Sequence, residues 1–96
     1  MKVIWKDPGQ QPKLVEIPNT LEALQEAVGG CIETVTFCTD ACVVCDEEGL
    51  FKGKEYNCNF LGVNFVGTIL LVGIAVEEFC DVPGGEFTLS LMKGVC

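Results

Sequence analysis

This chain of 96 residues contains seven cysteines, whose thiols could bind a metal or take part in redox chemistry. Three of them, Cys38, Cys42 and Cys45, lie within eight residues, and Cys31 and Cys58 are close enough in sequence to supply a fourth ligand. Structural zinc sites and iron–sulfur clusters are commonly held by four thiolates, so the spacing allows a cysteine-ligated metal or cluster. The two-residue gap between Cys42 and Cys45 is also that of a thioredoxin-like redox motif.

The predicted structure of the segment that carries Cys42 and Cys45 argues against both a metal site and a redox motif. Residues 41–46 are apolar on both faces up to Asp46 and predict a central strand, in which residues three apart point to opposite faces. Cys42 and Cys45 would then be unable to share one ion, and no helix follows Cys45 to activate a redox thiol. We therefore interpret the cysteines as small apolar core residues and predict neither a metal nor another cofactor.

The residue types that are missing narrow the chemistry further. The chain has no His and no Arg, and its only serine is Ser90, so it lacks the usual nucleophile–base pairs and any bidentate phosphate clamp. Its net charge of −8 excludes a nucleic-acid backbone or an anionic membrane surface as a partner. The one long apolar run, residues 65–76, is too short for a membrane helix. We expect a protein that is not an enzyme.

An odd number of cysteines and the absence of a secretory signal predict a cytoplasmic protein with reduced thiols.

Its acidic residues cluster at Asp46-Glu47-Glu48 and at Glu77-Glu78, which is typical of solvated turns. An alternative is nucleic-acid mimicry, in which carboxylates spaced like phosphates block a host defence or DNA-binding protein. Glu47 and Glu48 are the candidate interaction residues for that role.

The first third of the sequence predicts a hairpin followed by a helix. Strands are expected at residues 2–6 and 13–17, with a turn at Asp7-Pro8-Gly9 between them. Asn19 is the predicted N-cap of the helix, with Glu22 completing a capping box. Gly29-Gly30 ends it, because a left-handed residue at that position costs glycine little.

The remainder predicts strands at residues 31–38 and 41–46, joined by a tight turn at Thr39-Asp40. Residues 50–64 look irregular and are expected to wrap one edge of the sheet, residues 65–72 give the strongest strand pattern, and residues 86–96 fit either a strand or a short helix. The prediction is a single α+β domain over residues 1–96. It has a mostly antiparallel sheet of about four to six strands in the order ββαββ…β, with one main helix on one face.

The aromatic residues exceed what one covered face of such a sheet can bury. Either residues 50–64 cover the second face, or that face pairs with another chain, most simply in a symmetric homodimer. The aromatic residues concerned are Trp5, Phe37, Phe51, Phe60, Phe65, Phe79 and Phe87.

An ordered set of motifs resembles an uncharacterised small-domain family found in phages, conjugative elements and Firmicutes or gut anaerobes. The motifs are Asn19-Thr-Leu-Glu-Ala-Leu-Gln25, Val28-Gly-Gly30 with Ile32-Glu33, Asp46-Glu-Glu-Gly49 and Val66-Gly-Thr68. The likeness covers about residues 1–73, and residues 74–96 match less well. In that family an Asn-Arg pair often follows the glycine turn.

This chain keeps the asparagine of the pair as Asn57 but has Cys58 in place of the arginine. The resemblance makes Asn57 a third candidate interaction residue and implies a mobile-element context without an established activity. We therefore expect a non-catalytic cytoplasmic interaction or accessory module whose unknown protein partner binds an apolar patch. The alternatives are the acidic mimic and a metal protein built on Cys38, Cys42 and Cys45.

Overall fold

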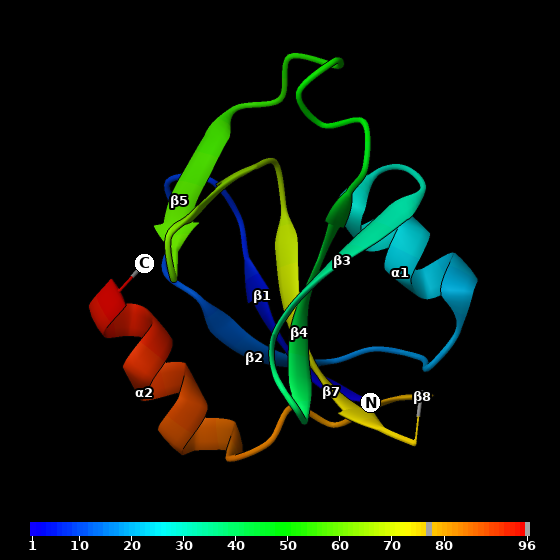
Figure 1. The fold of residues 1–96 in the computed structure, drawn as a ribbon, viewed down its shortest axis with the longest axis vertical. Coiled ribbons are helices and arrows are strands. Elements are labelled where there is room, and N and C mark those ends of the chain that lie inside the picture. Colours follow the sequence, from blue (N-terminus) through cyan, green and yellow to red (C-terminus); the bar gives the residue numbers. More distant parts are fainter. Residues whose placement is uncertain (77, 96) are drawn as a thin grey trace.

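A six-stranded antiparallel sheet forms the centre of the molecule (Figure 1). The computed structural model describes residues 1–76 and 78–95, so Glu77 of the second acidic pair and Cys96 lie outside the described residues. The sheet has the order β2-β1-β7-β4-β3, and β8 pairs with the end of β7 that β1 leaves free. Its strands are β1 (Lys2–Lys6), β2 (Lys13–Glu16), β3 (Ile32–Cys38), β4 (Ala41–Asp46), β7 (Ile69–Ala75) and β8 (Glu78–Cys80).

Helix α1 (Leu21–Val28) covers one face of this sheet. Its buried residues Leu24 and Val28 pack against side chains that alternate along three strands: Val3 of β1, Cys42 and Val44 of β4, and Leu70 and Val72 of β7. The expected helix is therefore confirmed, and Gly29 ends it with φ of 81°. The predicted cap at Asn19 is wrong, because the Thr20 hydroxyl accepts from the Ala23 backbone N–H while the Asn19 side chain donates to the Phe79 carbonyl.

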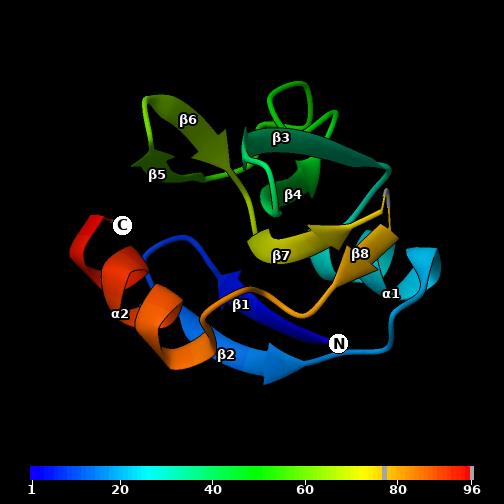
Figure 2. The same cartoon turned by 60° about the horizontal axis from the view of Figure 1, so that its bottom comes forward.

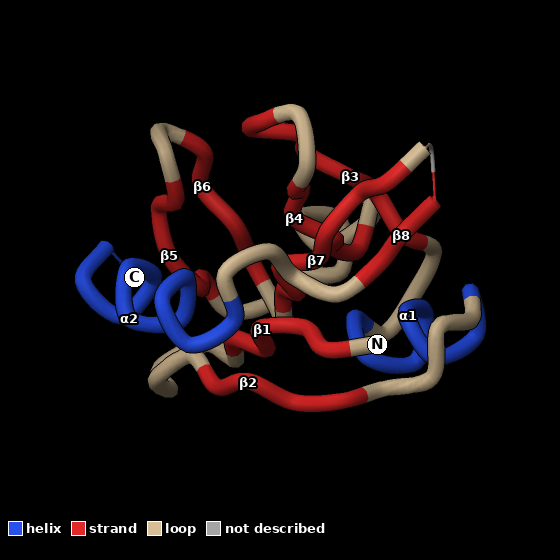
Figure 3. The backbone as a smooth tube through the Cα atoms, turned by 90° about the horizontal axis from the view of Figure 1, so that it is seen from below, coloured by secondary structure: helices blue, strands red, loops and turns tan. Residues whose placement is uncertain are grey.

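Two separate elements cover the other face. The first is the hairpin of β5 (Tyr56–Phe60) and β6 (Val63–Val66), and the second is helix α2 (Gly85–Val95). The hairpin replaces the irregular segment expected over residues 50–64, and α2 settles the ambiguous C-terminal stretch as a helix. Figures 2 and 3 show α2 and α1 at opposite ends of the molecule, with the hairpin on the side of α2.

The strand expected over residues 65–72 is interrupted at Gly67, which has φ of 70°. The chain therefore leaves the hairpin at Val66 and enters the central sheet at Ile69. The inward residues of the hairpin face are Ile4, Val43, Cys45, Ile69 and Leu71 from the sheet, Cys58, Phe60 and Phe65 from the hairpin, and Val82, Leu89 and Met92 from the C-terminal part. This packing fills the second face from within the chain and buries Phe60 and Phe65, whereas Phe51 and Phe87 remain 94% and 70% exposed.

The α+β class and the antiparallel sheet are thus as the sequence predicts, with a second helix and a separate hairpin added. Across residues 1–76 and 78–95, neither helix is long and apolar enough to cross a membrane.

Candidate functional site

The cysteines are distributed over both faces of the sheet rather than gathered. Cys42 packs in the α1 core and Cys45 in the hairpin core, so neighbouring thiols of β4 point apart. Burial raises the pKa of each of these two thiols to about 11, which keeps them protonated at neutral pH. Cys38 is exposed and donates to the Asp40 carboxylate. Within the part of the chain that the structure describes, no three His, Cys, Asp or Glu side chains gather closely enough to hold a metal ion.

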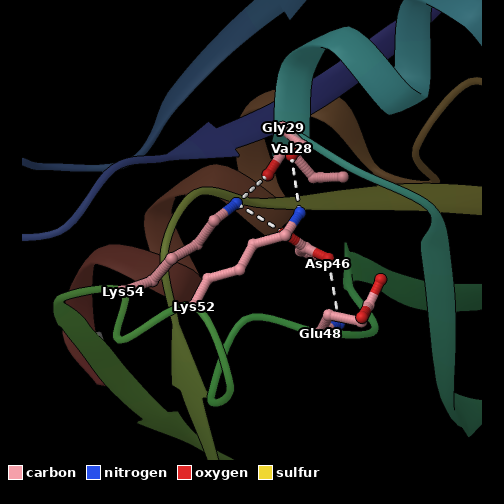
Figure 4. A network of polar contacts seen from close by, with 6 residues as sticks. All are labelled: Val28, Gly29, Asp46, Glu48, Lys52 and Lys54. Carbon is pink, nitrogen blue, oxygen red and sulfur yellow. Dashed lines mark hydrogen bonds and ion pairs between the residues drawn. The ribbon is translucent and has the colours of Figure 1, made fainter.

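A cluster of polar contacts centres on Asp46, at the end of β4 (Figure 4). One carboxylate oxygen lies 2.8 Å from Lys52 Nζ and 2.7 Å from Lys54 Nζ, and the other accepts from the Glu48 backbone N–H. The two lysines also donate to the last carbonyls of α1, Lys52 to Gly29 and Lys54 to Val28. Cations at a helix C-terminus are favourable, so this cluster ties the loop of residues 47–55 to the end of α1.

Electrostatics at Asp46 support a structural role. Burial by itself raises the pKa of this carboxyl, but the hydrogen bonds from Lys52, Lys54 and the Glu48 N–H together hold the pKa well below its usual range. A Cβ atom at Gly30 would lie 2.5 Å from Lys52 Nζ and 2.8 Å from Asp46 Oδ1. The second glycine of the Gly29-Gly30 pair therefore makes room for the ion cluster, a requirement that the sequence pattern did not indicate.

Asn57 lies at the base of the hairpin and is buried. Its amide donates to the Lys6 carbonyl at 2.8 Å and to the Gly67 carbonyl at 2.7 Å, and its oxygen accepts from Lys6 Nζ at 2.9 Å. These bonds join β5 to β1 and to the link between β6 and β7. The structure therefore places this predicted interaction residue in the interior, while Glu47 and Glu48 lie exposed on the loop after β4.

An apolar pocket of about 310 Å³ opens between the hairpin tip and α2. Its apolar lining consists of Phe37, Phe60, Leu61, Leu71, Leu91 and Met92. The rings of Phe37 and Phe60 meet edge to face, with centroids 5.3 Å apart. The polar side chain in the lining, Thr88, gives its hydroxyl proton to the Pro83 carbonyl, so the pocket offers apolar contact and little hydrogen bonding.

The rim of this pocket is exposed and partly strained. Leu61 is 63% exposed and Leu91 is 57% exposed, with Phe87 one helical turn from Leu91 on the outer side of α2. Leu61 and Gly62 form the two-residue turn of the hairpin, with φ of 52° and 86°. Turns of this kind favour Asn or Gly at the first position, and a leucine with positive φ is costly. An exposed, strained leucine beside an apolar pocket is the strongest functional signal in the described residues.

Sequence reasoning missed this site because its residues come from four elements far apart in the chain. One signal was available: Phe60-Leu61-Gly62-Val63 has the form of a tight hairpin turn, but with leucine where a polar turn residue is usual. The polar and sulfur-containing candidate residues chosen from the sequence lie outside the pocket, whereas Phe37 and Phe60, two of the aromatic residues named from the sequence, line it.

Comparison with known proteins gives one family. A family described as "Domain of unknown function (DUF3846)" matches residues 1–93, a span that includes α1, β1 to β8 and all but the last two residues of α2. Neither the curated proteins nor the solved structures contain a match to the chain.

Proposed function

The chain belongs to the DUF3846 family of domains of unknown function, and we propose that it is a small non-catalytic module that binds a protein partner. The observation that carries the proposal is Leu61, an exposed leucine held at positive φ on the rim of an apolar pocket. A partner that fills this pocket would bury Leu61, Leu91 and Phe87, and exposed apolar patches of this kind commonly mark protein interfaces.

The absence of catalysis is part of the proposal and rests on the available groups. The buried thiols of Cys42 and Cys45 stay protonated at neutral pH, and Asp46 is occupied by two lysines. A nucleophile needs a neighbouring base or a lowered pKa, and the chain contains no histidine to supply either. The proposal extends to a cytoplasmic accessory role in a mobile genetic element, which is supported by the resemblance of the ordered motifs noted above.

The test is affinity capture from an extract of the host cell, comparing the wild-type protein with Leu61→Asn and Leu91→Gln. Asn favours positive φ, so Leu61→Asn is expected to raise the free energy of unfolding by about 0.5 kcal/mol while partner recovery falls at least about tenfold. A loss of binding in a variant that is at least as stable as the wild type separates recognition from folding.

The matched control is the double variant Glu47→Gln, Glu48→Gln, which alters exposed charge at a different part of the surface. The proposal concerns the partner that the leucine variants lose; it predicts that this variant retains that partner and that 0.5 M salt changes its recovery little. The acidic mimic predicts the reverse: loss on removing Glu47 and Glu48 and a steep decline with salt. If no recovered protein is lost by the leucine variants, the proposed site is contradicted.

A further inference from the structure

The outer edge of β3 lies at the end of the six-stranded sheet, where no strand of residues 1–76 and 78–95 pairs with it. β3 is seven residues long and rich in β-branched and aromatic residues, and it carries a single charged side chain, Glu33. Natural edge strands of this length are usually guarded by Lys, Pro or a covering loop. β3 has only a bulge near its end, between Thr36 and Cys38.

The hydrogen-bond pattern of β3 identifies which backbone groups are unpaired. The Glu47 N–H donates to the Cys31 carbonyl at 3.0 Å, and the register continues as Glu33 opposite Cys45 and Val35 opposite Val43. Bonded and non-bonded pairs alternate along an antiparallel ladder. The N–H and carbonyl groups of Ile32, Thr34 and Thr36 therefore point away from β4, and these are the groups that an added strand would bind.

A small acidic pocket borders the same strand on the side of the hairpin. It has a volume of about 140 Å³, enough for about four or five waters at bulk density, and it lies between β3 and β6. Its carboxylates come from Glu33, Asp46 and Glu47, and its apolar walls include Val35 and Val63. Asp46 is already paired with two lysines, whereas neither Glu33 nor Glu47 has an ion pair with any described residue.

We propose that the β3 edge binds an extended segment of a basic protein, which adds as a strand and places a Lys or Arg side chain against Glu33 and Glu47. Main-chain hydrogen bonds would supply the affinity, and the acidic pocket would select one side chain of the added strand. The charge argument favours such a partner over a second copy of this chain, since each copy carries a net charge of −8. The β3 edge borders the apolar pocket at Phe37, but Glu33 and Glu47 do not line that pocket, so loss of peptide binding in Glu33→Lys tests this inference and not the proposed function.

The test uses a synthetic seven-residue peptide of alternating Thr and Val, acetylated and amidated, with Lys as its sixth residue. In antiparallel register this lysine lies opposite Glu33, and the valines lie opposite Val35 and Phe37. NMR titration is expected to shift the backbone amides of Ile32, Thr34 and Thr36. Replacing Glu33 by Lys should weaken binding about twofold to fivefold, as expected for one cross-strand charge pair.

Two matched pairs make the geometry falsifiable. N-methylation of the third and fifth peptide residues removes the N–H groups that face β3 and should abolish binding, whereas N-methylation of the fourth residue should not. In the protein, Thr34→Pro should abolish binding and leave the fold intact, because the Thr34 N–H is outside the ladder. Val35→Pro removes a ladder bond and should destabilise the sheet. If Thr34→Pro fails to fold, the assigned hydrogen-bond pattern is wrong.

Three results would overturn the proposal. One is binding that survives N-methylation at the third and fifth residues, and another is the absence of binding up to about 1 mM peptide. The third is a dimer of the peptide-free protein in analytical ultracentrifugation that disappears on Thr34→Pro, because the edge would then be occupied by a second copy.

Discussion

The two faces of the central sheet are closed in different ways. A single element, α1, covers one face, and the loop after β4 is fastened to its end through Asp46, Lys52 and Lys54. The other face is shared by the β5–β6 hairpin and α2, which come from different parts of the chain. Where these two elements meet, the apolar pocket opens, and Leu61 and Leu91 remain exposed on its rim.

This difference indicates at which positions a substitution can change binding while the folding stability changes little. On the α1 face, the carbonyls of Val28 and Gly29 at the end of the helix accept hydrogen bonds from Lys54 and Lys52, and few other side chains could replace these donors. At the seam between the hairpin and α2, Leu61 and Leu91 are exposed, whereas Met92 beside them belongs to the core. Substitutions on the α1 face should therefore change stability, and substitutions of the exposed seam residues should change binding.

Among substitutions of polar residues, replacing Asp46 by Ala should have the largest effect on stability, because it removes the acceptor of Lys52 and Lys54 together. We expect the free energy of unfolding to fall by about 2–3 kcal/mol in urea denaturation, less than for a fully buried ion pair, because the side chains of Lys52 and Lys54 are 40% and 23% exposed and can turn to solvent. Glu48→Gln, in the same loop but exposed, is the control and should stay within about 0.5 kcal/mol of the wild type. A loss below 1 kcal/mol in Asp46→Ala would mean that the loop is not held by this cluster.

Asn57→Ala should have the next largest effect, because Asn57 fastens the hairpin to β1 and to Gly67. Its loss leaves buried groups, including the Lys6 ammonium, with fewer partners, so we expect about 2 kcal/mol of destabilisation. Hydrogen exchange of the hairpin amides should also accelerate more than exchange of the central sheet. Asn59→Ala, in the same strand but exposed, is the control, and equal losses for the two variants would contradict an anchoring role.

Acid should destabilise the fold by protonating two carboxylates, those of Asp46 and Asp7. The folded-state pKa of Asp46 and that of Asp7 lie below the ordinary value of 3.8, the latter through the Thr68 hydrogen bond above all. Each group therefore contributes stability that is present above about pH 4 and is lost as pH falls toward the folded-state pKa. Denaturation midpoints measured from pH 6 to 2.5 should decline for the wild type and decline less for Asp46→Asn. Parallel curves would show that Asp46 makes no such contribution.

Local patterns of the sequence were sufficient for the part of the fold that α1 organises. Residues 41–46 are apolar at nearly every position and are indeed buried on both faces of the sheet, and Thr39-Asp40 forms the expected turn. The helix was predicted from the capping pattern at its start and from Gly29-Gly30 at its end, although its N-cap is Thr20 rather than Asn19. These features depend on neighbours within a few residues, which is the range over which periodicity carries information.

The hairpin and the candidate site depend on contacts that are distant in sequence. Residues 50–64 contain Lys, Gly and Asn at positions that dilute any alternation, and the hairpin is held partly by Asn57 through Lys6, 51 residues away. The pocket combines Phe37, Leu61 and Leu91, none of which carries a chemical signature. A search for reactive side chains could not find a site whose property is apolar exposure.

The smallest expected effect on stability is the one that tests the seam most directly. Leu91 and Met92 are neighbours on α2, but Leu91 is 57% exposed and Met92 is 1% exposed. Met92→Ala should cost about 2–4 kcal/mol through loss of core packing, whereas Leu91→Gln should cost about 0.5 kcal/mol or less, since Gln keeps the helix propensity of Leu. Urea denaturation of both variants measures the contrast. If Leu91→Gln destabilises the protein as much as Met92→Ala, then the seam is a closed part of the core, and the leucines on its rim are not available to a partner.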